Sequence, residues 1–196
     1  MKRFSALLLG GFGAIWVFGI VAAARNILRF ETTPGLADAP SSQWPNSTPF
    51  ARVTNRFTIV MFADPDCSCT RASLSELRKL LFAYPQTARV YVVFEKCRLG
   101  QAAANSSLWK SAATLPDTML VLDEAGEIAR QFHVTTSGQT FVYSRDGALS
   151  FRGGITSSRG HEGDSDGTKA IGSLLSGQTV SVSATPVYGC ALTNSR

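Results

Sequence analysis

The order of strand-like and helix-like segments constrains the fold of this chain more than any other feature. Three short apolar runs with strand character alternate with segments whose apolar residues recur at helical spacing. Two further strand-like runs flank the turn Arg145-Asp146-Gly147, which is typical of a hairpin. Strands connected by helices pair in parallel, whereas hairpin strands pair antiparallel. The order β-α-β-α-β-α-β-β-α therefore predicts an α/β domain whose mixed sheet is flanked by helices.

The predicted elements follow one another closely along the chain. In order they are strand 57–63, helix 70–84, strand 89–95, helix 102–114, strand 118–123, helix 127–134, hairpin strands 140–144 and 148–152, and helix 167–176. Hydrophobic residues make up 44% of the 196 residues, which is enough to bury a core. Residues 50–196 are therefore expected to form a single domain.

An apolar stretch precedes this domain. Residues 5–24 contain no charge, and a helix of that length spans about 30 Å, the thickness of a bilayer core. This indicates a single-pass transmembrane anchor after a short tail at residues 1–4. We expect it to lie in the cytoplasmic membrane, with the domain facing the periplasm or the outside.

A cleaved signal peptide is the alternative interpretation. Lys2-Arg3 resembles the basic region of such a peptide, and Ala22-Ala23-Ala24 resembles a cleavage site. The anchor is preferred because the apolar run is longer than the usual hydrophobic region of a signal peptide, and because Arg25 and Arg29 follow it directly.

Residues 25–49 have the composition of a flexible linker. The stretch 31–49 carries four prolines and several serines and threonines without apolar periodicity. It is expected to separate the domain from the membrane.

The charge of the domain excludes one class of partner. From Phe50 onward the chain has 15 basic and 12 acidic residues, and the basic ones do not cluster. Sequence-independent nucleic-acid binding needs a larger and denser positive surface. The chain also has only two histidines, so a His-rich metal site is excluded.

Two cysteines occupy a chemically favourable place. Cys67 and Cys69 lie between the strand 57–63 and the first turn of the helix that follows. Unpaired backbone N–H groups and the positive end of the helix dipole favour a thiolate there. The pattern predicts a nucleophilic sulfur at this turn.

The segments around these cysteines resemble a known family. FTIVMFADPDCSCTRASLSEL (57–77) and TMLVLDEAGEIARQFHVTTSGQTFVYSRDGAL (118–149) resemble membrane-tethered thiol-disulfide oxidoreductases of the TlpA/ResA type, with the thioredoxin fold. More narrowly, CSCTRASLSEL (67–77), GGITSSRGHEGDSDG (153–167) and TPVYGCAL (185–192) resemble RedB-type thioredoxin-like proteins. The resemblance covers residues 50–192 and implies a redox function and protein thiols or disulfides as partners.

The chain departs from the thioredoxin pattern in two places. The cysteines are spaced Cys-Ser-Cys, so Asp66 takes the place of the first cysteine of a Cys-x-x-Cys motif. A Cys67–Cys69 disulfide would close a small strained ring and would be labile. Asp66 is expected either to cap the helix or to disfavour the thiolate. Gly138 stands where the family has a cis-proline that docks substrates.

The two remaining cysteines have different expected roles. Cys97 ends the second strand and is expected to be a small buried residue or bystander thiol. Cys190 lies in a tail that is free to fold back over the turn and is a candidate resolving thiol. Four cysteines in an oxidising compartment leave both a Cys67–Cys69 and a Cys190 pairing open.

The loop 153–167 is expected to lie near these cysteines because the second hairpin strand returns to that edge of the sheet. Its functional interpretation assigns Arg159 to stabilising a thiolate, and His161 to proton transfer or metal binding. The alternative is a mobile surface loop that leads into the last helix.

Three functions are compatible with these residues. The preferred one is a thiol-disulfide oxidoreductase with catalytic Cys67, Cys69 and Cys190, assisted by Arg159 and His161, without a cofactor. The second is a copper-binding or copper-delivery module, because closely spaced thiols with Cys190 or His161 form a soft site for Cu(I). That idea also rests on a fold-level analogy with Sco-type copper chaperones. The third is a binding or scaffold protein with a purely structural disulfide.

Overall fold

The computed structural model describes residues 2–36, 41–96 and 102–192, and it divides into the units Met1–Thr33 and Pro34–Arg196. The first unit is the helix α1 (Lys2–Thr32). Its stretch Gly11–Thr32 has a mean hydropathy of 1.6 and is long and apolar enough to cross a membrane. A signal sequence near the N-terminus has the same properties, so an anchor and a signal sequence both fit this helix.

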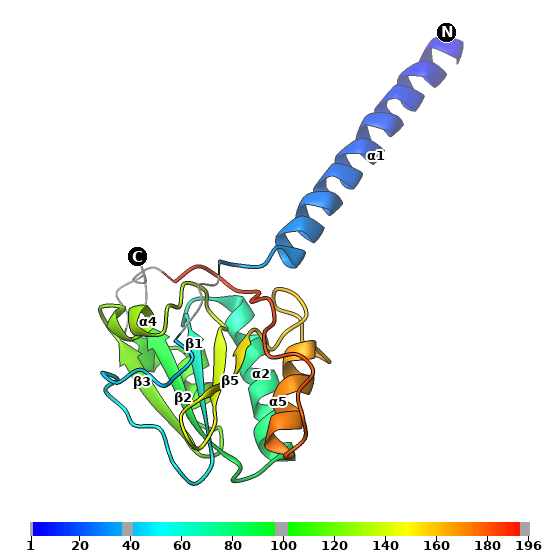
Figure 1. Cartoon of the computed structure of the whole chain (residues 1–196). Coiled ribbons are helices and arrows are strands. Elements are labelled where there is room, and N and C mark those ends of the chain that lie inside the picture. The colour runs from blue at the N-terminus through cyan, green and yellow to red at the C-terminus, as the bar shows by residue number, and fades with distance from the viewer. Residues whose placement is uncertain (1, 37–40, 97–101, 193–196) are drawn as a thin grey trace. The chain divides into compact units, whose positions relative to one another are not determined.

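The second unit is built on one five-stranded sheet with the strand order β3-β2-β1-β4-β5 (Figure 1). The strands are β1 (Phe57–Ala63), β2 (Ala88–Glu95), β3 (Thr118–Asp123), β4 (Thr140–Tyr143) and β5 (Leu149–Gly153). β2 pairs in parallel with β1 and β3, whereas β4 pairs antiparallel with β1 and β5. The predicted mixed sheet is therefore confirmed.

Helices cover both faces of the sheet. They are α2 (Ser68–Ala83), the 3₁₀ turn η1 (Ala103–Asn105), α3 (Ser107–Ala112), α4 (Glu127–Gln131) and α5 (Asp166–Leu175). The single helix predicted over 102–114 is divided into η1 and α3. The reason is local, because the Ser106 side chain accepts a hydrogen bond from the Trp109 N–H and caps a new helix.

Alternation along the strands supplies two hydrophobic cores. Ile59 and Met61 of β1 face the core formed with α2 and α5, which lie side by side in Figure 1. Val60 and Phe62 face the opposite core, to which α4 contributes. Because adjacent strand residues point to opposite faces, the continuous apolar run 57–63 is explained by a central strand buried on both sides.

Part of the predicted linker packs against this second core. The indole of Trp44 lies edge-on to Tyr143 at 5.0 Å and to Phe132 at 5.7 Å between ring centroids. The Leu149 N–H also donates to the Ser42 carbonyl at 2.9 Å. The compact unit begins at Pro34. This start differs from the boundary expected at Phe50, because aromatic residues before it add apolar surface to the sheet.

Candidate functional site

The turn between β1 and α2 is organised by Asp64. Its carbonyl oxygen accepts hydrogen bonds from the Cys67 N–H at 3.2 Å and from the Thr70 hydroxyl at 3.0 Å. Its carboxylate accepts from the Asp66 N–H at 2.8 Å. The N-cap residue of α2 is Cys67, which makes no side-chain capping bond. The N-cap position expected for Asp66 is therefore taken by Cys67, and the buried Asp64 holds the turn through these bonds.

This turn places two sulfurs at the start of α2. Cys67 is 2% exposed and immediately precedes the helix, while Cys69 is 7% exposed and lies in its first turn. Cys69 is a free thiol. The local sequence therefore produces two neighbouring but unequal sulfurs.

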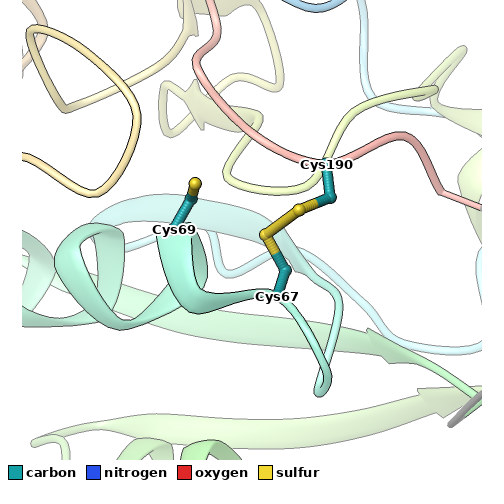
Figure 2. A group of neighbouring side chains, drawn as sticks. All are labelled: Cys67, Cys69 and Cys190. Carbon is teal, nitrogen blue, oxygen red and sulfur yellow. A yellow bond between two sulfur atoms is a disulfide. The ribbon is translucent and has the colours of Figure 1, made fainter. Parts of the chain in front are cut away.

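Cys67 is bonded to Cys190, 123 residues further along the chain (Figure 2). Their Cα atoms lie 6.1 Å apart, within the usual range for a disulfide. Of the two pairings that the sequence left open, the structure thus contains the one with Cys190. The Sγ atoms of Cys67, Cys69 and Cys190 all lie within 4.8 Å of one another.

The tail reaches this position along the outer edge of β5. The Arg152 N–H donates to the Ser183 carbonyl at 3.0 Å, and the Thr185 N–H donates to the Arg152 carbonyl at 3.1 Å. At Gly154 a Cβ would lie 2.6 Å from the Pro186 carbonyl oxygen, so only glycine allows this approach. The tail therefore covers a sheet edge before it turns toward Cys67.

Beyond β5, the tail pairs with the loop that precedes β4. The Ser137 N–H donates to the Cys190 carbonyl at 2.8 Å, and the Leu192 N–H donates to the Thr135 carbonyl at 2.9 Å. Thr136 and Ala191 form an antiparallel bridge between these bonds. The disulfide is thus accompanied by a short stretch of β pairing, which fixes the register of the tail.

The loop that receives the tail is itself tied to the redox turn. The Ser137 hydroxyl accepts from the Asp64 N–H at 2.9 Å and exchanges a hydrogen bond with the Thr70 hydroxyl at 2.8 Å. The Gly138 N–H donates to the Phe62 carbonyl at 2.7 Å. Gly138 has φ +87°, a conformation that glycine adopts without strain. Gly138 therefore lies in the loop that is hydrogen-bonded to the cysteine turn.

Arg159 is half-buried and donates through Nη1 to the Gly189 carbonyl, directly before Cys190. It thus contacts the backbone of the tail. His161 is exposed, and its side chain is not part of the sulfur group.

The loop that carries these two residues is fastened to α2. The Gly163 N–H donates to the Glu76 carboxylate at 2.8 Å, and the Ser75 hydroxyl donates to Glu162 at 2.8 Å. Lys79 forms an ion pair with Glu76 at 2.7 Å, and this hydrogen bond raises the pKa of Lys79. The loop around His161 therefore has fixed contacts with α2.

Among the described residues, the three cysteines form the group of donor atoms that is close enough together to hold a soft metal ion. A reduced domain would offer three thiols, a ligand set suited to Cu(I). The predicted bystander Cys97 lies outside the described residues.

A cavity of about 250 Å³ adjoins the paired tail. It is lined by residues 34–36, by Thr135 and Thr136, by Arg159, and by the tail residues Gly189, Ala191 and Leu192. The Gly35 N–H donates to the Val187 carbonyl at 2.8 Å, so the residues after α1 hold the tail from another side. The tail therefore has hydrogen-bonded neighbours and also borders a cavity.

Sequence reasoning missed the residues that seat the tail. Gly189 is buried against the Ser137 carbonyl, and Gly153-Gly154 admits the tail beside β5. The Gly-Gly pair after a strand was the available signal, because glycine there often marks a close backbone approach. The role of Ser137 had no comparable signal in the sequence.

Comparisons with solved structures agree with this fold. An uncharacterized conserved protein from Geobacillus kaustophilus matches with a TM-score of 0.57 and 20% identity, covering 82% of this chain and 91% of that one. A hypothetical protein from Sinorhizobium meliloti 1021 has a TM-score of 0.58 and 17% identity, covering 81% and 93%. The solution structure of a thioredoxin-like protein in the oxidized form has a TM-score of 0.50 and 14% identity, covering 76% and 97%. At these identities the matches show the fold, which is thioredoxin-like. No protein-family model and no curated protein matches the chain.

Proposed function

We propose that this protein is a thiol-disulfide oxidoreductase that exchanges its Cys67–Cys190 disulfide with thiols and disulfides of partner proteins. The observation that carries this proposal is the free thiol of Cys69, whose Sγ lies within 4.8 Å of both bonded sulfurs. A purely structural disulfide needs no third sulfur beside it. The thioredoxin-like fold and the position of the cysteines at a helix start support the same chemistry.

The net reaction transfers two electrons and two protons. A partner dithiol is oxidised to a disulfide, while Cys67–Cys190 is reduced to two thiols. The reverse reaction reduces a partner disulfide and restores the bond. Each half proceeds by attack of one thiolate on a disulfide sulfur with departure of the other sulfur as a thiolate.

Cys69 adds an internal step. Its thiolate attacks the Cys67 sulfur, the Cys67–Cys69 bond forms, the Cys67–Cys190 bond breaks, and Cys190 leaves as a thiolate that takes up a proton. The protein is neither oxidised nor reduced in this step. Cys69 can therefore release the tail, which makes it the internal resolving thiol in this proposal.

The oxidoreductase is proposed to work outside the cytoplasm. We take α1 as an uncleaved, single-pass anchor in the cytoplasmic membrane, with the domain facing the periplasm or the outside. The support is the disulfide, which persists in oxidising compartments. The quoted motifs carry the resemblance to TlpA/ResA-type and RedB-type proteins, so we place the chain nearest to those groups.

The test uses the full chain in detergent and a disulfide-linked reporter protein. Wild type should exchange disulfides with the reporter, and Cys67→Ser should abolish exchange because its sulfur takes part in both proposed pairings. Cys97→Ser is the control and should keep the wild-type rate. An unchanged rate in Cys67→Ser, or a loss confined to Cys97→Ser, would contradict the assignment.

Copper binding is the second candidate, and the three-sulfur group is the observation that favours it. Fully reduced full chain should then bind one Cu(I) in competition with a chelator, and Cys190→Ser should lose most of the affinity. His161→Ala tests whether the histidine completes the site. The absence of stoichiometric binding by reduced wild type would exclude this function.

A further inference from the structure

The tail is held next to Cys67 largely through its backbone. The bonds from Ser137 to Cys190 and from Leu192 to Thr135 join main-chain atoms, and Thr136 and Ala191 complete the antiparallel pairing. Such bonds do not depend on the side chains of the added strand. Any extended polypeptide can make them, as in other cases of strand addition.

The pairing also fixes which residue meets Cys67. Because the Ser137 N–H binds the Cys190 carbonyl, the side chain of the residue in this register lies against the Cys67 sulfur. Figure 2 shows the Cys190 side chain directed from the tail toward Cys67, with Cys69 on the same helix start. An occupant with a cysteine in this register would present it in the same way.

The position before this cysteine is sterically selective. Gly189 is buried, and a Cβ there would overlap the Ser137 carbonyl oxygen and lie 2.8 Å from the Ser137 carbonyl carbon. Ser137 cannot move away easily, because its hydroxyl is bonded to Asp64 and Thr70. The loop therefore accepts glycine at this position and opposes other residues.

Arg159 supports the same register by binding the backbone of the tail and not one of its side chains. Its guanidinium donates to the Gly189 carbonyl, the peptide group directly before the cysteine. The hydrogen bonds described here thus reach Gly189 and Cys190 at their main-chain carbonyls, and the side chain of Cys190 forms the disulfide.

We propose, on the basis of the oxidoreductase function above, that the loop at residues 135–137 selects extended substrate polypeptides that carry glycine immediately before the reactive cysteine. In the oxidised protein the segment 187–192 occupies this site as an internal substrate. The partner class is therefore a protein that presents a Gly-Cys segment in an extended conformation.

Substrate exchange follows from the internal step. After Cys69 has displaced Cys190, the tail leaves and a substrate segment pairs with residues 135–137. The substrate thiolate attacks the Cys67 sulfur, the Cys67–substrate bond forms, the Cys67–Cys69 bond breaks, and Cys69 leaves as a thiolate. The product has the arrangement now seen for Cys67–Cys190.

The experiment uses the full chain in detergent with the substitutions Cys69→Ser, Cys97→Ser and Cys190→Ser, so that Cys67 is the remaining thiol. The probes are the octapeptide TPVYGCAL and the same peptide with alanine in place of its glycine. In both peptides the cysteine is joined to 2-nitro-5-thiobenzoate. Attack of the Cys67 thiolate on the peptide sulfur forms the mixed disulfide and releases the coloured thionitrobenzoate, whose appearance gives the rate.

The glycine peptide should react at least tenfold faster than the alanine peptide. In denaturant the two peptides should react equally fast, because the selectivity depends on the folded loop. Equal rates with the folded protein, or no reaction with either peptide, would overturn the docking proposal. Failure of wild type to exchange disulfides with the reporter protein would instead overturn the oxidoreductase function.

A second measurement leaves all cysteines in place. Gly189→Ala should weaken the binding of the tail. In a glutathione buffer it should lower the equilibrium ratio of the Cys67–Cys190 disulfide to the other disulfide and thiol forms at least tenfold, as measured by mass mapping. Gly19→Ala in α1 is the control, since a Cβ there meets nothing within 4 Å and the residue keeps a helical backbone. An unchanged fraction in Gly189→Ala would also contradict the proposed seating.

Discussion

The two sides of the disulfide are built in different ways. The Cys67 side is a turn held by the bonds of Asp64 and Ser137, between β1, which contributes to both hydrophobic cores, and α2, which contributes to one. The Cys190 side is a tail beyond the last helix, held by backbone pairing with the loop at residues 135–137 and with β5. One sulfur therefore belongs to the framework, by which we mean the sheet and the helices packed on it. The other sulfur belongs to a segment that this framework binds.

The most severe change is expected in the framework. Leu77 of α2 is fully buried in the core that α2 shares with α5, so Leu77→Ala should lower the free energy of unfolding by about 2–5 kcal/mol in oxidised and reduced protein alike. Thermal unfolding measures this loss. Phe82→Ala, at a residue 66% exposed on the same helix, is the control and should change stability little. A small effect of Leu77→Ala would mean that α2 is no more part of the framework than the tail is.

Removal of the covalent link should show the opposite dependence on redox state. Cys190→Ser opens a loop of 123 residues and should cost about 2–4 kcal/mol relative to oxidised wild type. Relative to reduced wild type, the variant should unfold at nearly the same denaturant concentration. If Cys190→Ser were much less stable than reduced wild type, the tail would belong to the framework.

Ser137 connects the two sides and should give an intermediate effect. Ser137→Ala leaves the Asp64 N–H and the Thr70 hydroxyl without this partner inside the protein, which should cost about 1–3 kcal/mol. Denaturant titration measures the cost in the reduced state. Ser144→Ala removes the bonds of a half-buried hydroxyl to Asp146 and to the Ala148 carbonyl on the hairpin turn, and is a matched serine control that should leave the redox turn unaffected.

The smallest effect is expected at His161. It is exposed and outside the sulfur group, so His161→Ala should change stability by less than about 0.5 kcal/mol and exchange rates by less than about tenfold. Stopped-flow exchange between pH 5 and 8 checks both rate and pH dependence. A loss of 10²-fold or more would instead support the proton-transfer role that the sequence suggested.

Periodicity predicted most of the fold because the strands and helices are local patterns. The runs 57–63 and 118–123 match β1 and β3, and the hairpin was recognised from its turn. The division of helix 102–114 depends on one serine cap, which periodicity does not detect.

The candidate site was predictable only on its local side. The spacing of Cys67 and Cys69 relative to β1 and α2 indicated a redox turn. Asp64 and Asp66 both lie close to it, and the sequence did not show which of them holds the turn. The tail could not be predicted in detail because its contacts are mostly between backbone atoms. Gly189 matters through the space that a Cβ would need, and this becomes visible only when Ser137 is placed beside it.

The group of three sulfurs can hold only one internal disulfide at a time. Three sulfurs can form one disulfide in three ways, and each of the three isomers leaves one thiol over. Within this group the protein therefore stores two electrons and not four, and a count of free thiols is the same for every isomer. A redox titration would report one potential for the whole set of isomers, while the distribution among them is a separate equilibrium that requires no electrons. The oxidised group always keeps a nucleophile of its own.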